Sequence, residues 1–158
     1  MKIPLFFFSL LFFLSLKAQN IKKLDEDYGF KGFVFETGVE KYNNMKLIDN
    51  DGNYTYYKYE LDTLKINDCK LKEISYGFYK NKLYWISIKT GDYRDSKAIL
   101  KILETMYGKG RKFNEYSETY GWEGEKVKMA YNQNTFNKNA IINIWSQLMA
   151  DIIDKEKK

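Results

Sequence analysis

The chain has 158 residues, with 26 Lys and Arg, 21 Asp and Glu, a single Cys and no His. This length suits one domain with its own hydrophobic core. The lack of His excludes Ser-His-Asp and Cys-His nucleophilic centres, and a lone Cys excludes an intramolecular disulfide.

Residues 1–18 have the pattern of a cleavable secretion signal. Met1 and Lys2 form a short positive start, and residues 3–16 are almost wholly apolar. This run is shorter than the ~20 residues that span a bilayer, and Lys17 ends it. Because Ala18 suits the position before a signal-peptidase cut, we expect residues 19–158 to be exported as one globular domain. The alternative is an uncleaved membrane anchor.

The charge of the exported part is mixed and mildly basic. The whole chain carries a formal charge of +5, which becomes +3 when Lys2 and Lys17 are removed with the signal. Nucleic-acid-binding domains usually concentrate basic residues on one face. We therefore expect no nucleic-acid partner, and contact with a membrane only through the signal before cleavage.

The first predicted elements are a lead-in segment and a hairpin. Residues 24–35 supply aromatic candidates for the core, and a short helical turn is expected over residues 37–42. Residues 45–48 and 54–59 predict two strands, because Asp49-Asn50-Asp51-Gly52 between them is a strong turn signal.

After a short segment at residues 64–66, a second hairpin shows the clearest period-two alternation in the chain, with its turn at Lys80-Asn81-Lys82. The apolar residues expected on its core face are Ile74, Tyr76 and Phe78 on one strand and Tyr84, Ile86 and Ile88 on the return strand.

One amphipathic helix is predicted from about Asp95 to Tyr107, with Asp95 or Ser96 as its N-cap and Gly108 as its C-terminal stop. Its apolar stripe consists of Ile99, Ile102, Leu103, Met106 and Tyr107.

Strands are then expected at residues 119–122, 127–131 and 140–144, followed by a C-terminal helix that begins near Ser146. The predicted fold is therefore α+β: an antiparallel sheet of six to eight short strands, with one main helix on one face and a C-terminal helix.

Exposed aromatic residues are the best candidates for a binding surface. Trp85 and Trp145 fall on the strand faces opposite the strongest apolar stripes. They could form a surface with Tyr120, Trp122 and Tyr131, or the C-terminal helix could bury them.

Other motifs point to little chemistry. The Asp49–Asn53 run fails as a calcium loop in each register, because a required ligand or glycine is misplaced. A glycan hydrolase could work with two carboxylates alone, and Glu36, Glu115, Glu118, Glu123 and Glu125 are available. We predict no metal site, no cofactor and no catalytic residue.

Several short stretches resemble an uncharacterised family of small exported α+β proteins of Gram-negative bacteria. They are Leu24-Asp25-x-x-Tyr28-Gly29-Phe30, residues 76–83, Tyr107-Gly108, Trp122 and Trp145, and Cys69 departs from the pattern. Because these are core and turn residues and the family has no assigned function, the resemblance implies a fold and no activity.

The sequence thus favours a non-catalytic periplasmic or secreted domain that binds an unknown protein or envelope component. Two alternatives stay open: an inhibitor or immunity-type partner of another protein, and a carboxylate-based glycan hydrolase.

Overall fold

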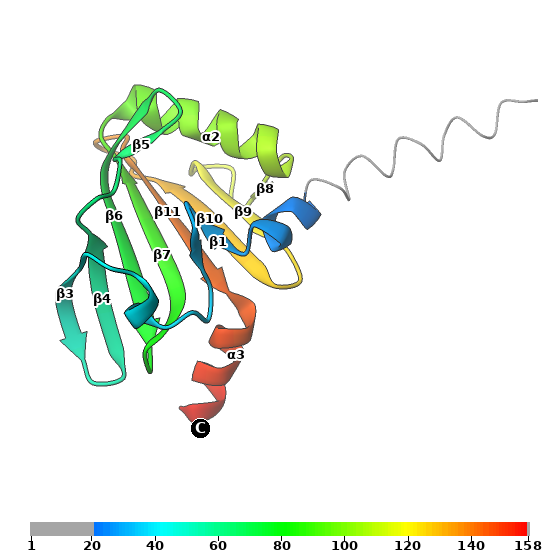
Figure 1. Ribbon diagram of the computed structural model, residues 1–158. Coiled ribbons are helices and arrows are strands. Elements are labelled where there is room, and N and C mark those ends of the chain that lie inside the picture. Colours follow the sequence, from blue (N-terminus) through cyan, green and yellow to red (C-terminus); the bar gives the residue numbers. More distant parts are fainter. Residues whose placement is uncertain (1–20, 158) are drawn as a thin grey trace, which may run out of the picture.

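The computed structural model describes residues 21–157, and the predicted signal at residues 1–18 lies outside them (Figure 1). After a helical stretch at residues 21–27, the elements are β1 (Gly29–Phe30), β2 (Phe33–Val34), the 3-10 helix η1 (Val39–Lys41), β3 (Met45–Asp51), β4 (Tyr54–Tyr59), β5 (Lys65–Ile66), β6 (Cys69–Tyr79), β7 (Lys82–Thr90), α2 (Tyr93–Tyr107), β8 (Arg111–Lys112), β9 (Thr119–Glu123), β10 (Val127–Gln133), β11 (Ala140–Ser146) and α3 (Gln147–Glu156). None of the helices within residues 21–157 is both long and apolar enough to span a membrane.

An antiparallel sheet organises this part of the chain, which confirms the predicted α+β fold. Its strands follow the order β3-β4-β6-β7-β11-β10-β9-β8, and β5 pairs with β6 as a ninth strand. The strands β1 and β2 form a separate small hairpin that is packed in front of the sheet (Figure 1).

One face of the sheet carries continuous apolar rows. Ile88 of β7 lies opposite both Ile74 of β6 and Ile142 of β11, and in the next row Ile86 lies opposite Ile144. All five side chains are buried. The alternation predicted for these strands is therefore confirmed, and it produces one core face because side chains two residues apart point the same way.

Two segments cover this core face. Helix α2 lies across one end of the strands and contributes Ile99 and Leu103, while the N-terminal segment contributes Leu24, Phe33 and Phe35 (Figure 1). All of them belong to one buried cluster, so the lead-in residues complete the core.

The start of α2 differs from the prediction. The helix begins at Tyr93, because Asp92 is its N-cap and accepts a hydrogen bond from the backbone N–H of Asp95 at 2.8 Å. Neither Asp95 nor Ser96 is the cap, and Ser96 is instead fully buried. The predicted stop is confirmed, since Gly108 ends the helix with a φ of 81° that glycine adopts without strain.

The prediction that Tyr84 shares the core face of its strand is wrong. A β-bulge shifts the register so that Gly77 lies opposite Trp85 and Phe78 lies opposite Leu83. The extra residue, Tyr84, moves to the face on which Trp85 lies, and both line the same hollow there. Leu83 takes the core position and is completely buried.

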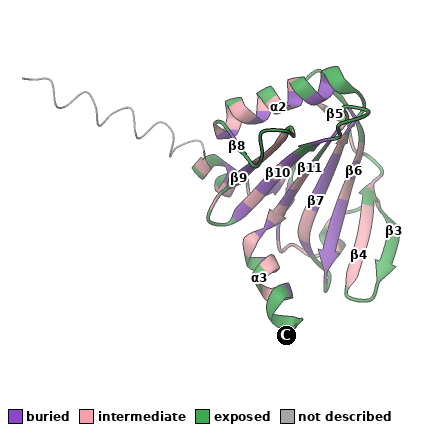
Figure 2. Cartoon of the chain, turned by 180° about the vertical axis from the view of Figure 1, so that it is seen from behind, coloured by how far each residue is buried: buried purple, intermediate pink, exposed green. Residues whose placement is uncertain are grey.

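The C-terminal helix α3 begins as predicted. Ser146 is its N-cap and accepts a hydrogen bond from the N–H of Met149 at 3.2 Å. Met149 and Ile153 pack on Tyr79 in a second buried cluster, apart from the main core. In the view from behind, α3 lies beyond one end of the strands and does not cover the middle of the sheet (Figure 2).

Candidate functional site

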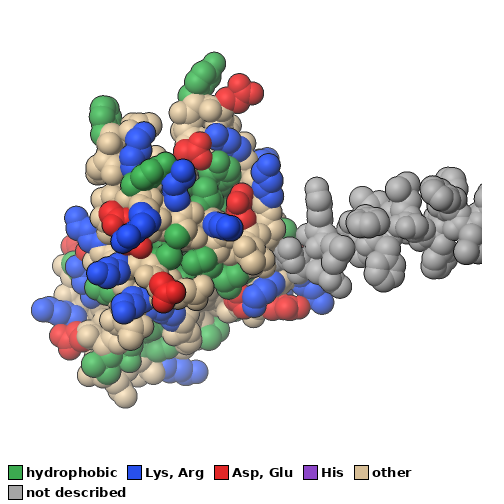
Figure 3. Space-filling view, turned by 90° about the horizontal axis from the view of Figure 1, so that it is seen from above, with side chains coloured by type: hydrophobic (Ala, Val, Ile, Leu, Met, Phe, Trp, Pro, Cys, Tyr) green, Lys and Arg blue, Asp and Glu red, His purple; other side chains and the backbone are tan. Residues whose placement is uncertain are grey.

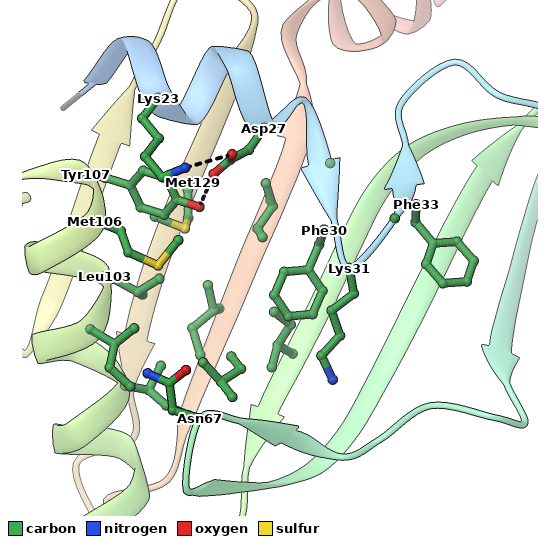
Figure 4. A pocket seen from close by; sticks show the side chains of 18 of the residues that line it. Lys23, Asp27, Phe30, Lys31, Phe33, Asn67, Leu103, Met106, Tyr107 and Met129 are labelled. Atoms are coloured by element: carbon green, nitrogen blue, oxygen red, sulfur yellow. Dashed lines mark hydrogen bonds and ion pairs between the residues drawn. The ribbon is translucent and has the colours of Figure 1, made fainter. Parts of the chain in front are cut away.

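A pocket of about 480 Å³ lies between α2, the β1–β2 hairpin and the core face of the sheet (Figure 4). Its apolar lining comes from the sheet, from α2 and from the hairpin: Ile88, Met129, Ile142, Ile144, Ile99, Ile102, Leu103, Met106, Phe30 and Phe33. This volume falls in the range of roughly 300–1,000 Å³ that is typical of small-molecule sites.

The pocket exists because its walls do not close on each other. Ile102 and Met106 of α2 and Phe30 of β1 pack against the main core and yet stay only partly buried. The sheet residues beneath them, such as Ile88 and Ile142, are almost fully buried, so the open apolar surface lies on the walls of the pocket and not on its floor. Such a space exposes apolar surface that a ligand of matching chemistry would shield from water.

Charged side chains surround this apolar interior. Among residues 21–157, the pocket is lined by three lysines, Lys23, Lys31 and Lys65, and by a single acid, Asp27. Asp27 is already neutralised by Lys23, whose Nζ lies 3.1 Å from Asp27 Oδ1. Lys31 donates a hydrogen bond to the carbonyl oxygen of Thr63. Lys31 and Lys65 thus leave the rim with an excess of positive charge.

Tyr107, the last residue of α2, fixes the position of Asp27. Its hydroxyl donates a hydrogen bond to Asp27 Oδ2 at 2.9 Å (Figure 4). Burial, and then this hydrogen bond to a carboxylate, raise the pKa of Tyr107. The phenol therefore stays protonated and holds the helix end against the N-terminal segment at one side of the pocket.

The surface around α2 is mixed in charge. In the view from above, Lys and Arg side chains are interspersed with Asp and Glu, and hydrophobic side chains lie between them (Figure 3). This face does not have the concentrated basic character that is typical of nucleic-acid-binding surfaces.

Sequence reasoning missed the pocket. Ile88, Ile102 and Ile142 were predicted as core residues, and nothing local distinguishes a core position that packs fully from one that borders a cavity. The positive side chains on the rim come from the lead-in segment and from β5, which lie apart in sequence. Only the folded arrangement brings Lys31 and Lys65 to one opening.

The five aromatic residues predicted from the sequence divide between the two faces of the sheet. Trp85 and Trp145 are direct cross-strand partners on the face away from α2, and both are half-buried. Tyr120, Trp122 and Tyr131 belong to the α2 side, where they are packed in or against the main core. They therefore do not form one surface with the tryptophans.

Trp122 and Tyr131 have structural contacts of their own. Trp122 donates its indole N–H to the carbonyl of Gly108 at 2.7 Å, and the hydroxyl of Tyr131 donates to the carbonyl of Ser96 at 3.1 Å. Both side chains are almost fully buried. Each ties β9 or β10 to α2, so they act as core residues and are closed to a ligand.

Two of the carboxylates considered for glycan hydrolysis are paired with basic side chains. Glu118 Oε2 accepts from the Tyr120 hydroxyl at 2.6 Å, and Lys112 lies 2.9 Å from Glu118 Oε1. These two contacts, in that order, lower the pKa of Glu118. Glu123 pairs with Arg111 at 3.3 Å.

Glu36 connects distant parts of the chain. It accepts hydrogen bonds from the hydroxyl groups of Tyr28 and Ser146, the latter at 2.7 Å. Burial, and then the bond to Glu36, raise the pKa of Tyr28 to about 12. The remaining candidates, Glu115 and Glu125, are exposed.

The described part of the chain contains no candidate metal centre. Residues 21–157 contain no group of three or more His, Cys, Asp or Glu side chains placed to hold an ion. Cys69 is a buried residue at the start of β6, and burial raises the pKa of its thiol. A thiol with a raised pKa is a poor nucleophile.

No family model and no curated protein matches this chain. Among solved structures, it is weakly similar to a DUF4309 family protein (YjgB) from Bacillus subtilis, with a TM-score of 0.45 and 10% sequence identity. That match covers 82% of this chain and 97% of the other. The resemblance to an exported Gram-negative family stays a prediction.

Proposed function

We propose that the protein is an exported, non-catalytic binding module whose pocket under α2 holds a single-chain amphiphile with an anionic head group. One observation carries the proposal: the floor and walls of a pocket of about 480 Å³ are apolar. Export is part of the proposal and rests on the pattern of residues 1–18. The envelope is where such amphiphiles are abundant.

The apolar interior supports a hydrocarbon tail. Ile102, Met106 and Phe30 stay only partly buried in the free protein. A chain laid between them would bury its own methylene groups and these side chains together, at about 0.8 kcal/mol per methylene. A hydrocarbon tail has no polar groups that would lose hydrogen bonds to water on entering the pocket. An unbranched hydrocarbon therefore suits the site better than a polar molecule of equal size.

The rim supports an anionic head. Asp27 is engaged by Lys23 and Tyr107, whereas Lys31 and Lys65 add positive charge at the opening. A carboxylate or phosphate in this position would gain charge-assisted hydrogen bonds while its tail lies inside. A neutral head group would gain only the hydrophobic part of the binding energy.

The proposal can be tested with two probes that share one tail. Protein expressed from the full-length sequence is titrated with dodecanoate and with dodecanol, and binding is followed by calorimetry. We expect saturable one-to-one binding of dodecanoate and at least tenfold weaker binding of dodecanol. Equal affinities for the two probes would show that the charge of the head group does not contribute to binding. If neither probe binds, the proposal is refuted.

Two pairs of variants locate the ligand. Ile102→Trp fills the pocket from α2 and should abolish binding, while Thr105→Trp adds the same ring on the exposed side of the helix and should not. Lys65→Glu should weaken dodecanoate binding, whereas Lys109→Glu makes the same charge change away from the pocket. Equal effects within either pair would place the ligand elsewhere.

The alternatives from the sequence have their own signatures. An inhibitor or immunity-type protein would form a tight complex of fixed stoichiometry with one protein, and a glycan hydrolase would release reducing ends from envelope glycans. Either result without amphiphile binding would replace the proposal.

A further inference from the structure

A second hollow lies on the opposite face of the sheet and has a different chemistry. It measures about 420 Å³ and is bordered by β3, β4, β7, β11 and α3. Five of its lining residues are aromatic: Tyr54, Tyr56, Tyr84, Trp85 and Trp145. None of them lines the pocket under α2, so this hollow is independent of the amphiphile site.

The strand pairing and a β-bulge place these aromatic side chains on the same face of the sheet. Trp85 and Trp145 face each other across β7 and β11, and the β-bulge turns Tyr84 to the same side. Gly77 lies between Tyr56 and Trp85 in the neighbouring strands. A Cβ at Gly77 would come within 2.9 Å of the Trp85 ring, so the absent side chain gives this ring its place.

The rings stand at steep angles to one another. Tyr56 and Trp85 are nearly perpendicular, at 89° with centroids 5.9 Å apart, and Tyr54 and Tyr84 meet at 66°. Both pairs are therefore edge-to-face contacts and not parallel stacks. The hydroxyls of Tyr56 and Tyr84 lie 3.3 Å apart, which connects the two pairs.

The charged groups around the rings favour a cation. Asp51 and Asp154 line the hollow, and Lys157 is the basic residue among its lining residues. This local excess of negative charge contrasts with the +5 of the whole chain. Aromatic faces carry negative potential and attract cations within about 6 Å of the ring centroid, with Trp the strongest.

We propose that this hollow binds an organic cation, specifically a quaternary ammonium group. Such a group has no N–H donors to satisfy and is weakly hydrated, so ring faces can replace its water. Asp51 and Asp154 supply charge at the rim while the methyl groups contact Trp85 and Trp145. A primary ammonium could direct N–H groups at Asp51 and Asp154, but the five ring faces offer such donors no directed acceptor and suit methyl groups better.

The test uses choline and its uncharged isostere, in which carbon replaces nitrogen. Protein expressed from the full-length sequence is titrated with each while tryptophan fluorescence is recorded. We expect saturable binding of choline and at least tenfold weaker binding of the isostere, because only the charge differs. Equal affinities, or no saturable response to millimolar choline, would overturn the proposal. Saturable binding of an oligosaccharide without a response to choline would overturn it in favour of a glycan site.

Variants separate the site from the fold. Asp154→Asn should weaken choline binding several-fold, while Asp151→Asn removes a charge from the same helix outside the hollow and should not. Trp145→Leu should weaken it at least tenfold, because the variant loses one of the two indole rings of the hollow. Melting temperatures show which variants are folded. Equal loss in Asp154→Asn and Asp151→Asn would contradict the assignment.

Discussion

Asp25 Oδ1 accepts a hydrogen bond from the backbone N–H of Val127 at 2.8 Å, across 102 positions of the chain. The same carboxylate accepts from the N–H groups of Lys126 and Glu125, each also at 2.8 Å. One side chain of the N-terminal helical stretch thus satisfies three donors of the β9–β10 turn. Gly124 makes room for it, because a Cβ there would collide with the carboxylate.

We expect Asp25→Asn to lower the free energy of unfolding by about 1–3 kcal/mol, since an amide cannot accept from all three N–H groups and carries no charge. Urea denaturation measures the change. Glu26→Gln, at an exposed neighbour with only a 3.6 Å contact to Lys22, is the control and should change little. Equal losses in both variants would mean that the turn is not held by Asp25.

Gly77→Val is expected to destabilise the protein by about 1–3 kcal/mol, because the new Cβ would meet Trp85 at 2.9 Å and Tyr84 at 3.1 Å. Gly91→Ala is the matched control, since its Cβ would find nothing nearer than 3.9 Å. Thermal unfolding compares the two. An unchanged melting temperature for Gly77→Val would show that the β6–β7 pairing is wrong.

Phe78→Ala should cost about 3–5 kcal/mol, the usual range for a large aromatic residue removed from a core. Phe78 is completely buried and packs edge-on against Tyr57 at 5.4 Å between centroids. Phe136→Ala removes the same ring from a position that is 93% exposed and should be nearly neutral. Chemical denaturation that finds equal stabilities would contradict the position of Phe78 in the core.

The ion pairs of Glu73 lead us to expect that the stability of the protein depends on pH. Its carboxylate contacts Lys58 at 2.7 Å and Lys89 at 2.8 Å, and these two hydrogen bonds lower its pKa from 4.5 to about 2. Because the pKa of Glu73 is lower in the folded state, its ion pairs stabilise the protein at pH values above the unfolded-state pKa. This stabilisation is lost as the pH falls from about 4.5 towards 2.

Glu73→Gln should therefore be less stable than the parent at pH 7, by about 1 kcal/mol, because both lysine side chains are about half exposed to solvent. The difference should disappear near pH 2, and denaturation curves at several pH values measure it. A difference that stays constant with pH would show that the ion pairs do not carry it.

The sequence alone determined the elements with strong periodicity. Ile74 and Ile88, the Val127–Tyr131 alternation and the α2 stripe could be assigned because a buried face repeats every two residues in a strand and about every 3.6 in a helix. The start of α3 near Ser146 could be assigned, whereas the cap of α2 was expected at Asp95 or Ser96 and lies at Asp92.

The tertiary structure alone decided the pairings between distant segments. The β-bulge places Leu83 instead of Tyr84 on the core face, and it lies next to Gly77 of the neighbouring strand. The sequence of β7 alone does not predict this bulge. The sequence placed Trp85 and Trp145 on the face away from the core, yet only the sheet order makes them partners and separates them from Trp122. Both proposed sites arise in the same way, because a cavity is a property of surfaces that meet only after folding.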